Sequence, residues 1–96
     1  MDKFTIKNKK QMGNLPKTAG VYCFIDKKET IYIGKAINIK DRVKNHFNQP
    51  SYRDNLFIDK VGKIGFIETG SEIEALILEA NLIKKYQPKY NVIWKD

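Results

Sequence analysis

The sequence predicts a single α/β domain in which a small sheet is flanked by helices. Three observations lead to this prediction: a hairpin pattern in the first half of the chain, a capped helical pattern in the second half, and a length of 96 residues. A chain of this length has room for one modest core. We therefore expect a loose lead-in over residues 1–14, which are polar and aperiodic, and one domain over residues 15–96.

Composition narrows the class of protein. Lys and Arg outnumber Asp and Glu by 18 to 11, and the resulting net charge of +7 attracts phosphate-bearing partners, although it also serves solubility. No apolar run approaches the roughly 18 residues of a membrane span, and no apolar stretch follows the basic N-terminus, which predicts a cytoplasmic protein with no membrane partner. One Cys and one His exclude a disulfide framework and a zinc cluster, so any metal would be a hard cation bound by oxygen.

The stretch from Gly20 to Gly34 predicts a β-hairpin in which Asp26 pairs with Thr30 across a three-residue loop. Strand alternation sorts its side chains onto two faces. One face carries Val21, Cys23, Ile25, Ile31 and Ile33, and the other carries Tyr22, Phe24 and Tyr32. The aliphatic face predicts a core wall. On the aromatic face a tyrosine ring can pack while its hydroxyl still seeks a partner, which indicates either simple packing or a site.

A helix is expected over residues 39–47, with Asn38 as its N-cap and Asp41 in its first turn. Its apolar stripe consists of Ile39, Val43 and Phe47. Beside this stripe lie Arg42 and His46, four residues apart, so both should project from the margin of the packed face. Arg42 can clamp a phosphate or lie on a solvated face, and His46 can transfer protons or simply pack.

Pro50 ends this helix, and Ser51 with Asp54 suggests a short helix to about Lys60. Residues 61–69 then predict a third strand, and residues 90–94 a last short extended segment.

The clearest helix start is the capping box formed by Ser71 and Glu74, and the helix should end near Tyr86. Helical spacing places Glu79 in the middle of an apolar arc. That arc comprises Ile73, Ala75, Leu76, Leu78, Ala80, Leu82 and Ile83. An ionised carboxylate in such a setting must be neutralised, paired with a cation or bound to a metal. A buried ion pair with Arg42 or a lysine is one reading, and a single Mg²⁺ or Mn²⁺ is the other.

Together these residues resemble the signature of the GIY-YIG nucleases, with Gly20-Val21-Tyr22 as the first motif and Tyr32-Ile33-Gly34 as the second. The likeness continues through Lys35, Arg42, His46, Glu79 and Asn91 and covers residues 15–96. The flanks LPKTAGVY and ILEANLIKKYQPKYNV look like the N-terminal endonuclease domain of the UvrC family, and the related Cho proteins are similar.

The resemblance implies the GIY-YIG nuclease fold, an α/β sandwich with a central three-stranded antiparallel sheet. It also implies a single divalent cation, Mg²⁺ or Mn²⁺, bound by Glu79. Seven positions of this chain match the family's site: Tyr22, Tyr32, Lys35, Arg42, His46, Glu79 and Asn91.

The implied reaction is phosphodiester hydrolysis in DNA. Tyr22 or Tyr32 would help to activate the attacking water, and Lys35, three residues after Tyr32, could assist by lowering a tyrosine pKa. Arg42 would stabilise charge on the phosphate, and Asn91 would support the site by hydrogen bonding.

His46 stands where UvrC proteins commonly carry tyrosine and homing endonucleases of the superfamily carry histidine, so the group that handles the proton stays open. The implied role is the incision on the 3′ side of a lesion, with damaged duplex DNA and, through a full-length chain, the UvrB–DNA complex as partners. We expect the domain to be monomeric. A domain excised from such a chain would cut weakly alone. The alternatives are a stand-alone homing-like or restriction-like nuclease and a catalytically silent nucleic-acid-binding module.

Overall fold

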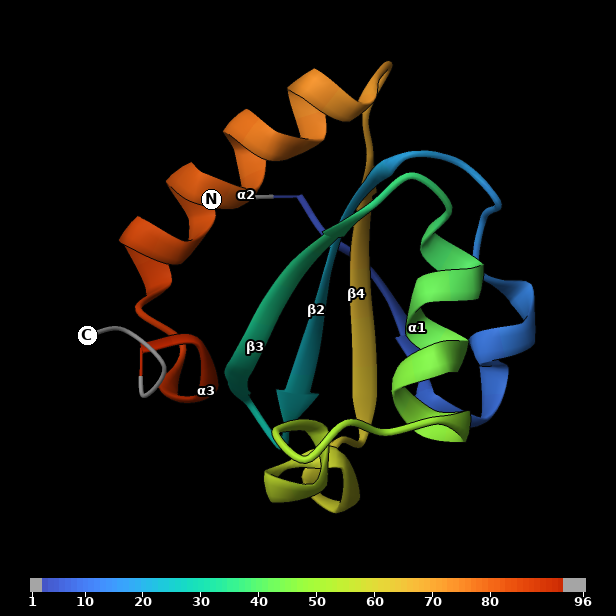
Figure 1. Cartoon of the computed structure of the whole chain (residues 1–96), viewed down its shortest axis with the longest axis vertical. Coiled ribbons are helices and arrows are strands. Elements are labelled where there is room, and N and C mark those ends of the chain that lie inside the picture. Colours follow the sequence, from blue (N-terminus) through green and yellow to red (C-terminus); the bar gives the residue numbers. More distant parts are fainter. Residues whose placement is uncertain (1–2, 93–96) are drawn as a thin grey trace.

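The computed structural model describes residues 3–92, which form a four-stranded antiparallel sheet with the strand order β1-β4-β2-β3. The two long helices flank this sheet (Figure 1). The strands are β1 (Thr5–Asn8), β2 (Gly20–Asp26), β3 (Glu29–Ala36) and β4 (Lys63–Glu68). The helices are α1 (Ile39–Asn48), α2 (Glu72–Tyr86) and α3 (Lys89–Val92), with 3₁₀ turns η1 (Lys9–Asn14), η2 (Asp54–Leu56) and η3 (Ile58–Lys60).

The β2–β3 hairpin has the predicted register over most of its length. Tyr22 lies opposite Gly34, and Phe24 lies opposite Tyr32. Glycine is required at position 34, because a Cβ atom there would overlap the hydroxyl group and ring of Tyr22. The absence of a side chain therefore lets the Tyr22 ring lie across β3.

The turn of this hairpin differs from the prediction. Asp26 pairs with Glu29 instead of Thr30, so two residues form the loop, and Lys27 adopts a left-handed conformation with φ of 58°. The shift between the two registers leaves Ile31 as an extra residue in β3. Ile31 consequently packs with the aromatic face and not with the aliphatic face.

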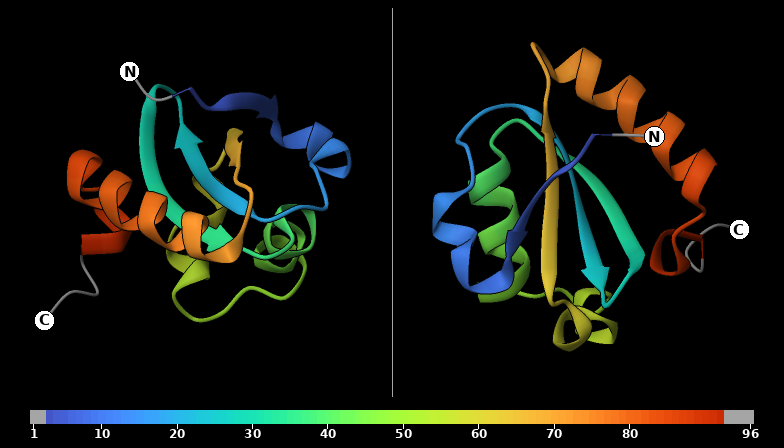
Figure 2. Two further views of the ribbon diagram at one scale, coloured as in Figure 1. Left: turned by 90° about the horizontal axis from the view of Figure 1, so that it is seen from above. Right: turned by 180° about the vertical axis from the view of Figure 1, so that it is seen from behind.

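The prediction of a three-stranded sheet is wrong by one strand. Residues 5–8, which were expected within a loose lead-in, form β1 and pair with β4, as Figure 2 also shows. The side chain of Ile6 is half exposed, so β1 is held mainly by backbone pairing and carries little amphipathic signal.

Each face of the sheet is covered by one helix. The aromatic face packs against α1 through Ile39 and Val43, which are fully buried. As predicted, α1 follows the N-cap Asn38, whose side-chain oxygen accepts the amide of Asp41 at 3.0 Å. The aliphatic face packs against α2 through Ala75 and Leu82.

The start of α2 is as predicted, with one difference in its cap. The Ser71 hydroxyl accepts the amide of Glu74 at 3.2 Å, but the Glu74 carboxylate accepts the amide of Gly70 at 2.6 Å instead of that of Ser71. The prediction that the whole apolar arc of this helix is buried is wrong for one side of the arc, because Ile73 and Leu76 are 71% and 51% exposed.

Two further segments differ from expectation. The single helix predicted near residues 51–60 is replaced by the turns η2 and η3, and the extended segment predicted over 90–94 begins inside α3. Its residues 93 and 94 lie outside the described part of the chain. Within residues 3–92, no helix has both the length and the apolar character needed to cross a bilayer.

Candidate active site

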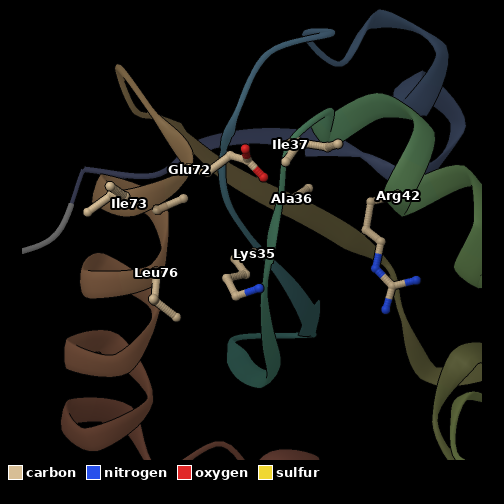
Figure 3. A pocket seen from close by; sticks show the side chains of 8 residues that line it. Lys35, Ala36, Ile37, Arg42, Glu72, Ile73 and Leu76 are labelled. Atoms are coloured by element: carbon tan, nitrogen blue, oxygen red, sulfur yellow. The ribbon is translucent and has the colours of Figure 1, made fainter.

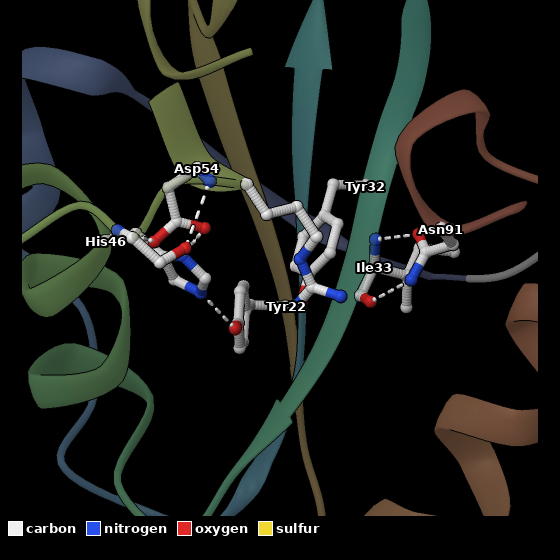
Figure 4. Close-up of polar contacts among 8 residues, drawn as sticks. Tyr22, Tyr32, Ile33, His46, Asp54 and Asn91 are labelled. Atoms are coloured by element: carbon white, nitrogen blue, oxygen red, sulfur yellow. Dashed lines mark hydrogen bonds and ion pairs between the residues drawn. The ribbon is translucent and has the colours of Figure 1, made fainter. Parts of the chain in front are cut away.

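A buried chain of hydrogen bonds links Tyr22 of β2, His46 of α1 and Asp54 of η2 (Figure 4). The Tyr22 hydroxyl lies 2.6 Å from His46 Nε2, and His46 Nδ1 lies 2.9 Å from Asp54 Oδ1. The three residues are only 1%, 2% and 5% exposed, respectively. His46 was expected to project from the margin of the packed face of α1 and is instead part of the core.

The turn that follows α1 fixes the carboxylate of Asp54. The amide of Ser51 donates to Asp54 Oδ2 at 3.0 Å, and the amide of Asp54 donates to the Ser51 hydroxyl at 3.1 Å. Burial alone would raise the pKa of Asp54, but the Ser51 amide and the facing His46 outweigh it and leave this pKa below its usual value. Asp54 is therefore a carboxylate at neutral pH.

For the two neighbours of Asp54, burial has a larger effect on the pKa than the nearby charges do. It lowers the pKa of His46 by more than Asp54 raises it, so the imidazole is neutral near pH 7. It raises the pKa of Tyr22 far above its ordinary value, with Tyr32, Asp54 and Glu79 adding to the effect and Arg42 opposing it. Tyr22 is therefore a protonated phenol.

Tyr32 lies beside Tyr22, with 6.3 Å between the ring centroids, and its hydroxyl contacts a cationic side chain. An Arg53 guanidinium nitrogen donates to the Tyr32 hydroxyl at 3.2 Å. Burial raises the pKa of Tyr32, and Arg53 and Arg42 oppose that rise. Lys35, which was the expected source of a lowered tyrosine pKa, faces Glu79 instead.

The free edge of β3 is capped by a side chain from the C-terminal part of the chain. Asn91 of α3 binds both backbone groups of Ile33: its Oδ1 accepts the amide at 2.8 Å, and its Nδ2 donates to the carbonyl at 2.9 Å. Two residues along the same strand, the ammonium and backbone of Lys35 lower the pKa of the Glu79 carboxyl on α2. Asn91 thus continues the hydrogen-bonding pattern of the sheet beyond its last strand.

Glu79 is half-buried on α2 and is the candidate metal ligand. Burial raises its pKa by more than the Lys35 ammonium and backbone lower it, so a further cation beside this carboxylate would be favourable. Among residues 3–92, no three His, Cys, Asp or Glu side chains gather as a complete protein metal site. The donors present fit Mg²⁺, which often takes one or two protein carboxylates and completes its shell with water and substrate phosphate.

A pocket of about 440 Å³ opens beside these groups, between β3, α1 and the first turns of α2 (Figure 3). Its cationic side chains are Lys35 and Arg42, and its acidic side chain is Glu72. The rest of the lining is apolar and includes Ile73 and Leu76, the α2 side chains that were expected in the core.

The structure brings most of the predicted residues to one region but separates Arg42 from His46. Arg42 is exposed and lines the pocket, whereas His46 lies behind it in the core. Sequence reasoning missed Arg53 and Asp54 as site residues. The pattern Ser51-x-x-Asp54 was visible, but it was interpreted as a helix start because the partner of Asp54 Oδ1 is remote from this turn in the sequence.

Comparison with protein families gives a match to the UvrC-like GIY-YIG domain over residues 18–92. The chain is 46% identical over 90 residues to UvrABC system protein C of Carboxydothermus hydrogenoformans, covering 90% of this chain and 15% of that protein. It is 48% identical over 89 residues to the protein of the same name from Borrelia duttonii, covering 91% of this chain and 15% of the relative. The chain therefore spans about 15% of the length of these curated relatives.

Among solved structures, the N-terminal GIY-YIG endonuclease domain of UvrC from Thermotoga maritima, bound to its catalytic magnesium ion, is similar with a TM-score of 0.79. The two chains are 41% identical, and the match covers 86% of this chain and 93% of that one. The same Thermotoga domain has been solved as single variants, three with a tyrosine replaced by phenylalanine and one with an asparagine replaced by alanine.

Proposed function

The chain belongs to the UvrC-like GIY-YIG domain family, and on that premise we propose that it is a divalent-metal-dependent DNA endonuclease domain that hydrolyses a phosphodiester bond. The observation that carries this proposal is the pocket itself. Lys35 and Arg42 line one cavity, and Lys35 also faces the half-buried carboxylate of Glu79. Lys35 therefore connects the cations that can bind a phosphate with the carboxylate that can bind a hard metal ion.

The variants of the Thermotoga domain support the assignment of the site residues. Its three substituted tyrosines and its asparagine are separated by ten, fourteen and forty-five residues along that chain. Tyr22, Tyr32, His46 and Asn91 have the same separations. By this spacing His46 stands where the Thermotoga domain has its third tyrosine.

The chain's own groups have distinct roles in the proposed reaction. Arg42 clamps the phosphate and stabilises the charge that develops on it, and Lys35 adds a second cation on the same side. Tyr22 and Tyr32 are the candidate acceptors of the proton of the attacking water. Glu79 would hold the divalent cation, which when bound supplies charge stabilisation for the leaving oxygen. Asn91 holds β3, which carries Tyr32 and Lys35, in place.

The proposed biological role follows the relatives, which are components of the UvrABC system. The substrate is duplex DNA carrying a lesion, and the cut is the incision on the 3′ side after UvrB has marked the site. The net charge of +7 suits binding to DNA phosphates, and the cytoplasm is the proposed location. The domain acts as a monomer within the larger assembly.

The test is nicking of a lesion-containing duplex in the presence of Mg²⁺, UvrB and the remaining part of a UvrC chain. We expect the parent to nick only with the metal, and Glu79→Gln and Arg42→Ala to lose roughly 100-fold or more in rate. Glu29→Gln in the hairpin turn and Lys44→Ala on α1 alter exposed residues outside the site and serve as matched controls.

Nicking by Glu79→Gln and Arg42→Ala at the parental rate would contradict the catalytic assignment. A parent that binds the duplex but never nicks it would instead indicate a silent nucleic-acid-binding module.

A further inference from the structure

Asp54 is a buried carboxylate to which the reaction outlined above assigns no role. Both of its oxygens are engaged, one by the Ser51 amide and the other by His46 Nδ1. The short turn from Ser51 to Asp54 is closed by the reciprocal bond from the Asp54 amide to the Ser51 hydroxyl. The carboxylate is thus held at a fixed place behind the imidazole.

This arrangement determines which nitrogen of His46 carries the proton. An ionised carboxylate can only accept hydrogen bonds, so His46 Nδ1 must be the donor in the 2.9 Å contact with Asp54. In a neutral imidazole the other nitrogen is then an acceptor. The 2.6 Å contact between His46 Nε2 and Tyr22 must therefore be donated by the Tyr22 hydroxyl.

The direction of that bond bears on the chemistry of Tyr22. A phenol that stays protonated can take a proton from water only if it releases its own proton in the same step. The lone pair of His46 Nε2 faces the Tyr22 hydroxyl, which would release this proton. The Tyr22 ring lies beside that of Tyr32, the other candidate proton acceptor, with 6.3 Å between the ring centroids.

We propose that Asp54 is a positioning residue that holds His46 with its proton on Nδ1, so that Nε2 can receive the proton of Tyr22 during hydrolysis. The inference depends on the proposed nuclease function. In the step, an O–H bond of the attacking water breaks, its proton passes to the Tyr22 oxygen, and the Tyr22 proton passes to His46 Nε2. The water oxygen bonds to phosphorus as the bond from phosphorus to the leaving oxygen breaks, and that oxygen takes a proton from solvent. The imidazolium formed faces the Asp54 carboxylate and later returns its proton to solvent.

The chain contains one histidine, which allows a direct test by NMR. In protein labelled with ¹⁵N-histidine, long-range ¹H–¹⁵N correlations near pH 7 distinguish a proton on Nδ1 from one on Nε2. We expect Nδ1–H in the parent and in Tyr22→Phe, because Asp54 fixes the tautomer in both. In Asp54→Ala we expect the tautomer with the proton on Nδ1 to be no longer the major one. Asp59→Ala, which alters an exposed aspartate in η3, should behave like the parent.

A parent with its proton on Nε2 would overturn the proposal, as would an Asp54→Ala protein, folded by its backbone amide spectrum, that keeps the parental tautomer. If Tyr22→Phe alone changed the tautomer, Tyr22 and not Asp54 would be the group that fixes it. Tyr22→Phe retains the turn and so remains informative if Asp54→Ala fails to fold.

Nicking provides the second readout. Asp54→Ala should lower the rate roughly tenfold to 100-fold, less than most of the roughly 100-fold to 10,000-fold range typical of a general acid or base, because Asp54 acts only through His46. The substrate concentration required should change little. Unchanged nicking by Asp54→Ala would overturn the role in hydrolysis. Absence of nicking by the parent would instead overturn the nuclease function, while the NMR result would still decide whether Asp54 positions His46.

Discussion

Replacement of Asn91 by alanine removes two hydrogen bonds from the edge of the sheet. The Asn91 side-chain oxygen accepts a hydrogen bond from the Ile33 amide at 2.8 Å, and the Asn91 side-chain nitrogen donates one to the Ile33 carbonyl at 2.9 Å. A typical intramolecular hydrogen bond contributes about 0.5–1.5 kcal/mol net, so the pair should contribute about 1–3 kcal/mol to the free energy of unfolding. For a domain of this size, a loss of that magnitude lowers Tm by roughly 5 to 20 °C.

The assay is urea unfolding combined with amide hydrogen exchange. We expect Asn91→Ala to unfold at lower urea and the Ile33 amide to exchange faster, because β3 loses its cap. Asn91→Asp is a sharper variant, since a carboxylate can accept the Ile33 amide but repels the Ile33 carbonyl. It should be no more stable than Asn91→Ala at neutral pH. Asn81→Ala on the exposed side of α2 is the matched control.

The outcome that would refute this reasoning is a loss below about 0.5 kcal/mol together with unchanged Ile33 exchange. Such a result would mean that the edge of β3 is not held by Asn91 in solution, and that any effect of Asn91→Ala on nicking has another origin.

Three further predictions concern the hairpin and its neighbours. Gly34→Ala should cost about 1–3 kcal/mol, measured by urea unfolding, because the new Cβ overlaps Tyr22; parental stability would contradict the packing described for this pair. Arg53→Gln should raise the pKa of Tyr32 further, since a cation that opposes the effect of burial is removed, and ¹³Cζ-tyrosine NMR titration should detect the rise; no change would exclude Arg53 as that cation. Glu79→Gln in EDTA should unfold at higher urea than the parent, because a half-buried charge is replaced by a neutral amide; a lower midpoint would count against burial as the dominant effect at this residue.

The hairpin and its place in the fold could be predicted because the relevant information is local. Alternation alone places Tyr22 and Tyr32 on one face, and the structure confirms their register. The fold class is confirmed by the Thermotoga domain, with four strands instead of three. Strand β1 was not predicted because an edge strand held by backbone pairing needs no apolar face. Its residue Ile6 is half exposed.

The wide apolar arc of α2 shows a limit of helical periodicity. The spacing identifies which residues share a side of the helix, but not how much of that side the sheet can cover. Ala75 and Leu82 are covered by β2 and β3, whereas Ile73 and Leu76 border the pocket beside Arg42.

Arg53 could not be assigned to the site because its partner, Tyr32, is remote in the sequence. Asp54 could not be assigned because the end of α1 separates it from its partner, His46. The local pattern predicted a helix start at Ser51, where the structure instead has a turn closed by hydrogen bonds between Ser51 and Asp54. Nothing in that pattern indicates that the second oxygen of Asp54 meets His46, because this contact depends on how the turn folds back over α1.

The central claim is that Glu79 holds a divalent cation beside the phosphate pocket, and the most direct measurement is anomalous scattering from crystals soaked in Mn²⁺. We predict a peak at coordination distance, roughly 2.0–2.2 Å, from a Glu79 carboxylate oxygen and its loss in Glu79→Gln. A peak elsewhere in the parent, or a peak that persists at the same place in Glu79→Gln, would contradict the claim.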